Sequence, residues 1–71
     1  MIDINLKNRV IKKRNLFFGK VRDLRLPSEV NDKIFEMSYE MELANCTGDF
    51  CKGKALLNEI KTVIKEAIHT P

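Results

Sequence analysis

The first third of the chain has a hydrophobic pattern that predicts extended structure. Apolar and polar residues alternate over residues 2–7, which is the two-residue period of a β-strand. Residues 8–19 show no clean period. A second alternation follows over residues 23–26, and Pro27 ends it because proline cannot donate a hydrogen bond to a neighbouring strand. We therefore expect one or two short strands before residue 27.

The period changes to that of an α-helix at Ser28. Apolar residues then recur at steps of four, three, four and three up to Ala44, so they share one stripe of a helix. Gly48 can close this helix in the left-handed conformation, and Asp49 can cap a second helix. The apolar stripe of the second helix extends as far as Ile68. Two antiparallel helices are the predicted result.

These elements predict an α+β fold that is mostly α-helical, in which short N-terminal strands precede two antiparallel helices. The chain divides into a basic N-terminal arm or extra strand, residues 1–19, and a strand-helix-helix domain, residues 20–71. A chain of 71 residues buries little apolar surface by itself, so we expect a second copy to complete the core.

Positive charge is concentrated near the start of the chain. Residues 1–26 hold eight of the 13 Lys and Arg residues and only two of the ten acidic residues. Residues 27–71 hold the remaining five bases and eight acids. A polyanion would be attracted to one end of such a chain, so the asymmetry favours a nucleic-acid partner.

The sequence offers no constellation that would support catalysis or metal binding. Its single His69 and its two cysteines, Cys46 and Cys51, lack the further ligands that a zinc site requires. Its three glycines form no phosphate-binding loop. No apolar run approaches the length of a membrane span, and no signal peptide opens the chain. We expect a cytoplasmic protein with reduced thiols that is not an enzyme and uses no cofactor, metal or membrane.

The segment LRLPSEVNDKI, residues 24–34, resembles the ribbon-helix-helix repressors of the Arc and MetJ group. In that family a strand passes directly into the first of two helices. Two chains pair their strands into an antiparallel ribbon that enters the major groove of DNA, and their four helices form a shared core. The resemblance implies a homodimeric transcriptional regulator that binds duplex DNA, of the kind that a virus or plasmid would encode.

The resemblance also implies which residues contact DNA. It places the ribbon at residues 20–26 and makes Arg25 the base reader, because a guanidinium can form two hydrogen bonds with a guanine edge. It places a phosphate clamp near residues 49–54, where the second helix begins. The predicted nucleic-acid-binding set is Lys12, Lys13, Arg14, Lys20, Arg22, Arg25, Lys52 and Lys54.

Two other functions fit the same residues. The first is a protein-interaction module, a small inhibitor or adaptor, in which residues 2–10 and 16–26 form a hairpin or edge strands and the chain docks on a larger protein. The second is RNA binding through the same basic arm. Pairing of residues 20–26 with their own copy would favour the repressor, whereas pairing with residues 1–18 would favour the interaction module.

Overall fold

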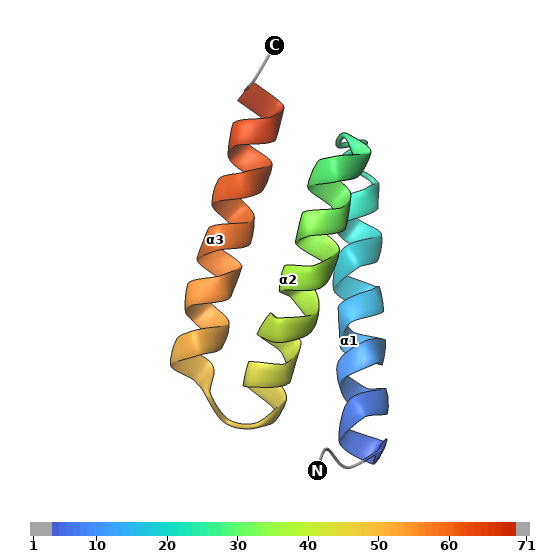
Figure 1. Cartoon of the computed structure of the whole chain (residues 1–71), viewed down its shortest axis with the longest axis vertical. Helices are drawn as coiled ribbons and strands as arrows, with labels where there is room; N and C mark the ends of the chain where they lie inside the picture. The colour runs from blue at the N-terminus through green and yellow to red at the C-terminus, as the bar shows by residue number, and fades with distance from the viewer. Residues whose placement is uncertain (1–3, 70–71) are drawn as a thin grey trace.

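Residues 4–22 form an α-helix, so the prediction of strands is wrong for the described part of the N-terminal segment. The computed structural model describes residues 4–69, in which helix α1 spans Ile4–Arg22 (Figure 1). Residues 2 and 3 of the first predicted strand lie outside the described residues. Apolar residues at 6, 10, 17 and 21 step by four, seven and four, which is a helical period. The helical period extends over most of the segment, whereas the alternations cover only a few residues at each end, and the segment is helical.

The two helices predicted from Ser28 onward are present. Helix α2 spans Ser28–Cys46 and helix α3 spans Phe50–His69. Between them, Gly48 has the left-handed conformation expected of it, with φ 88°. The Asp49 carboxylate accepts a hydrogen bond from the Lys52 amide at 3.2 Å, so Asp49 caps α3 as its side chain predicts.

The described helices run up, down and up, and α2 lies between the other two and packs against both (Figure 1). The described part of the chain therefore has an all-α architecture, not the α+β class predicted from the sequence. The molecule is elongated, with extents of 43 × 21 × 16 Å. The first described residue, Ile4, and the last, His69, lie at opposite ends of its long axis.

The core forms where side chains of all three helices meet. Its buried centre contains Val21 from α1, Ile34 and Met41 from α2, and Ile60 from α3. The predicted apolar stripe of α2 packs into this core. A buried hydroxyl, that of Ser38, donates a 2.6 Å hydrogen bond to the Ile34 carbonyl and so is satisfied.

The segment assigned to the ribbon, residues 20–26, is the end of α1 followed by a loop. The Leu24 amide donates to the Val21 carbonyl at 3.0 Å, and the Arg25 amide donates to the Arg22 carbonyl at 3.1 Å. These hydrogen bonds are those of tight turns, and none of residues 4–69 belongs to a strand. A ribbon-helix-helix fold requires an extended segment at this place, so the described residues do not form that fold.

Candidate nucleic-acid interface

Helix α1 presents a face of positive charge to solvent. Seven of its 19 residues are basic and none is acidic. At 100° per residue, four of the basic residues fall within about a third of the helix circumference. We call these four the α1 basic face; they are Arg9, Lys12, Lys13 and Lys20, and all four are exposed. Three of them belong to the set predicted from the sequence; Arg9 does not, although its four-residue step to Lys13 is a signal that places both on one face.

Arg14, a member of the predicted set, is instead part of the contact between α1 and α2. Its Cζ atom lies 4.0 Å from the centroid of the Phe35 ring and 5.9 Å from that of Tyr39. The Phe35 ring in turn packs on Phe18, with the centroids 5.0 Å apart and the planes at 52°. A half-buried guanidinium held over aromatic rings stabilises the fold through a cation–π contact. Its Nε and Nη2 atoms also donate hydrogen bonds to Oδ1 of Asn15, at 3.2 and 2.9 Å.

Arg22 and Arg25 do not occupy the strand positions that the sequence analysis gave them. Arg22 is the last residue of α1 and lies beside Phe18, Asp32 and Phe35 at the rim of a shallow hollow. Arg25 lies in the loop with φ 56°, a left-handed conformation that costs a residue with a side chain about 1 kcal/mol or more. Both side chains are exposed. Without a ribbon, Arg25 has no strand from which to read a base edge.

The predicted phosphate clamp at the start of α3 is already occupied by a carboxylate. Asp49 accepts the amide hydrogen bond that a phosphate would take, and its negative charge repels an anion there. Lys52 is exposed on the same turn and lines a hollow with Asp49 and Glu40. Lys54 is also exposed, and it shares a stripe of α3 with Lys61 and Lys65, seven and eleven residues later.

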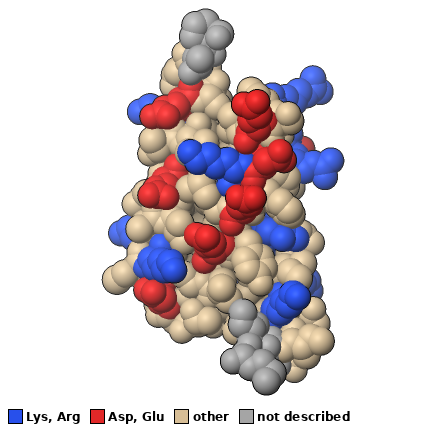
Figure 2. Space-filling view, in the orientation of Figure 1, with Lys and Arg blue, Asp and Glu red and all other residues tan. Residues whose placement is uncertain are grey.

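Negative charge is gathered on α2, which carries five acidic residues and one basic residue. Figure 2 shows a row of acidic side chains along α2 in the orientation of Figure 1. The residues that step by three, four and four along this helix are Glu29, Asp32, Glu36 and Glu40, and all are exposed. The fold therefore separates an acidic helix from a basic one, so a polyanion would be attracted to α1 and repelled from α2.

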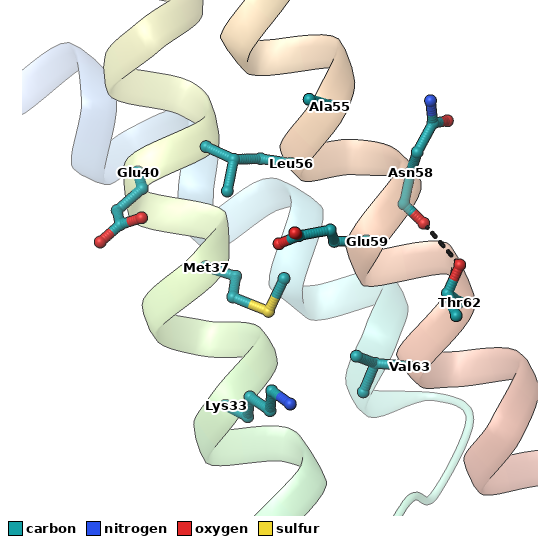
Figure 3. A pocket seen from close by; sticks show the side chains of 9 residues that line it. All are labelled: Lys33, Met37, Glu40, Ala55, Leu56, Asn58, Glu59, Thr62 and Val63. Carbon is teal, nitrogen blue, oxygen red and sulfur yellow. Dashed lines mark hydrogen bonds between the residues drawn. The ribbon is translucent and has the colours of Figure 1, made fainter.

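A hollow of about 570 Å³ lies between α2 and α3 (Figure 3). Met37 from α2 and Val63 from α3 point toward one another across it. Lys33 and the exposed carboxylates of Glu40 and Glu59 also line it. The Thr62 hydroxyl, another lining group, donates to the Asn58 carbonyl at 3.0 Å.

The described residues hold no group of three His, Cys, Asp or Glu side chains that could bind a metal ion. Cys46 is half-buried and Cys51 is exposed, and both thiols are free. None of the helices within residues 4–69 is long and apolar enough to cross a lipid bilayer.

Comparison of the chain with protein-family models, with curated proteins and with solved structures finds no match in any of the three.

Proposed function

We propose that this protein is a non-enzymatic DNA-binding regulator that holds duplex DNA through the α1 basic face. The single observation that supports the proposal most strongly is the separation of charge by helix. Four exposed bases share one face of α1, a helix without acidic residues, while the acidic residues of α2 form a row on another surface. The proposal places the protein in the cytoplasm.

The dimensions of the α1 basic face suit a DNA backbone. It extends over twelve residues, from Arg9 to Lys20, which are about 16 Å apart along a helix axis. The major groove of B-DNA is about 12 Å wide and admits an α-helix, so bases on such a helix can contact the phosphates on both sides. Contacts to phosphate position a protein without reading sequence. The proposal needs no homodimer, because one chain presents the whole face.

The proposal is tested by titrating the chain into a fluorescent duplex of mixed sequence at two salt concentrations. Neutralisation of four phosphates would lower the affinity roughly 100-fold between about 50 mM and about 200 mM salt, because bound counterions are released from the DNA. A variant in which all four residues of the α1 basic face are replaced by Gln should lose most of this affinity and of its salt dependence.

A matched control keeps the same change of net charge. It replaces by Gln four other exposed bases, namely Lys7, Arg22, Lys33 and Lys52. The proposal expects the control to bind far more tightly than the α1 variant. Equal losses in the two variants would show that only net charge matters, and absence of binding at low salt would reject the proposal. Circular dichroism checks that both variants keep their helices.

The RNA alternative is separated by repeating the titration with duplex RNA of the same sequence. The major groove of A-form RNA is deep and narrow, so side chains on a helix do not enter it as they enter the major groove of DNA. The proposal therefore expects weaker binding to the RNA duplex. Tighter binding to RNA than to DNA would replace the proposed function with RNA binding.

A further inference from the structure

An apolar groove of about 310 Å³ lies between α1 and α3. Every described residue that lines it comes from α1, from the turn after it or from α3. Six of these residues are apolar and two are lysines: Phe17, Lys20, Val21, Leu24, Leu57, Ile60, Lys61 and Ile64. Val21 and Ile60 are buried core residues, so the floor of the groove is the open edge of the core itself.

The backbones of α1 and α3 each lie close to that of α2 but not to each other. Side chains of α1 and α3 meet in the core, and the groove lies where the two backbones stay apart. Three helices in this arrangement occupy three positions of a four-helix bundle, and the fourth position lies over the groove. Helices in bundles pack with their axes about 8–10 Å apart, so one more helix is the object that such a groove accommodates.

Exposed apolar side chains lie at the end of the groove and beyond it. Leu24, which lines the end of the groove, is 47% exposed. Ile68 follows Ile64 by four residues and Phe50 precedes Leu57 by seven, so both share its stripe on α3; they are 56% and 69% exposed. An apolar strip of this kind indicates a binding surface.

The rims of the groove are positively charged. Lys20 stands on the α1 wall and Lys61 on the α3 wall, and no described lining residue is acidic. The acidic residues of α3, Glu59 and Glu66, line hollows shared with α2 instead. A partner that fits the groove therefore has an apolar stripe with negative charge on both sides of it.

We propose that the groove binds an amphipathic α-helix of another protein, whose apolar stripe is flanked by Asp or Glu. The charge of the rims selects this occupant over a second copy of the chain, since two grooves facing each other would place lysines against lysines. The concave shape favours a helix over an anionic membrane surface, because a flat surface would leave the hollow empty. The apolar floor favours a helix over nucleic acid, which gains nothing from contact with Val21 and Ile60.

The proposal is tested with two synthetic helical peptides of about 18 residues, above the length at which isolated helices become marginal. Both carry leucines at helical spacing; one has Glu on the flanks and the other has Lys. Fluorescence anisotropy should show the full chain binding the Glu-flanked peptide at least about tenfold more tightly than the Lys-flanked peptide.

Variants of the chain locate the binding site. The double variant Lys20→Glu and Lys61→Glu should reverse the preference between the peptides. The control pair Lys33→Glu and Lys52→Glu makes the same charge change at exposed positions that do not line the groove, and should leave the preference unchanged. The variant Leu24→Ser changes a largely exposed wall residue and should weaken the binding of both peptides.

Three results would overturn the proposal. The first is equal binding of the two peptides, or binding that the groove variants do not change. The second is a dimer in sedimentation that Leu24→Ser dissociates, because the occupant would then be a second copy. The third is tighter binding to phosphatidylserine vesicles than to the Glu-flanked peptide, if the double variant Lys20→Glu and Lys61→Glu abolishes the vesicle binding.

The variant Lys12→Gln separates the groove from the DNA-binding face, since it should weaken DNA binding and leave peptide binding unchanged.

Discussion

Replacement of Arg14 by Ala tests whether this cation belongs to the fold or to the nucleic-acid interface. Its Cζ atom lies 4.0 Å from the centroid of Phe35, whose ring packs on Phe18 with the centroids 5.0 Å apart. The replacement removes the guanidinium and two methylene groups from this contact between α1 and α2. We therefore expect a loss of stability and an unchanged affinity for DNA.

The size of the effect follows from the contacts of Arg14. A cation–π contact at a partly desolvated site contributes about 1 kcal/mol. Half-burial of two methylene groups contributes about 0.8 kcal/mol, since full burial of each is worth roughly that much. The better helix propensity of Ala offsets about 0.2 kcal/mol. A net loss of about 1.5 kcal/mol should lower Tm by roughly 6–12 °C in a domain of this size.

Thermal unfolding followed by circular dichroism measures this loss, with Lys12→Ala as the matched control. Lys12 carries the same charge on the same helix but is exposed, so its replacement should change Tm by no more than about 3 °C. In the DNA titration we expect the larger effect from the Lys12 variant and not from the Arg14 variant. Lys12→Ala should reduce the salt slope by about 0.9, and Arg14→Ala should leave it unchanged. Equal Tm values, or equal slopes, for the two variants would refute the reasoning.

Three other changes test the packing and the helix ends. Ile34→Val should cost about 1 kcal/mol in urea unfolding because Ile34 is fully buried, whereas Ile68→Val on the surface should cost nearly nothing; equal costs would contradict the assigned core. Asp49→Ala should cost about 1 kcal/mol because the cap of α3 is lost, and Asp49→Asn should restore most of it; a cost for Asn as large as for Ala would argue against capping. A Cβ at Gly53 would meet the Asn45 side chain. Gly53→Ala should therefore show its helix-propensity gain of about 1 kcal/mol only when combined with Asn45→Ala, and additive effects would exclude the contact.

Helices α2 and α3 could be predicted because their evidence is local. Each has an apolar stripe at helical spacing, and the residues that begin and end them have side chains suited to those places. Pro27 precedes α2, and Gly48 and Asp49 separate it from α3. The spacing of apolar residues and the identity of end residues act within a few turns of the chain, so a single sequence contains them.

Helix α1 is hard to predict from the sequence because its inward face includes a cation. Arg14 occupies a half-buried position between Val10 and Phe17, so the apolar stripe is interrupted in the sequence. Its ring partners, Phe35 and Tyr39, belong to α2 and lie more than twenty residues away. The short alternations at 2–7 and 23–26 therefore give the stronger local pattern, and it is that of a strand.

The candidate interface could also be predicted only in part. The sequence shows how many cations the first third holds, but not which of them face solvent. The structure assigns Lys12, Lys13 and Lys20 to one exposed face with Arg9, and assigns Arg14 to the helix contact.

The charge of each segment, the positions of α2 and α3 and the cap between them depend on composition and on neighbours within a few turns, so they can be predicted from the amino-acid sequence alone. Three features need the folded chain: the helical state of the first segment, the exposure of each cation, and the place between α1 and α3 where the core lies open. These depend on contacts such as that of Val21 with the cluster around Ile60, which bring together residues far apart in the chain.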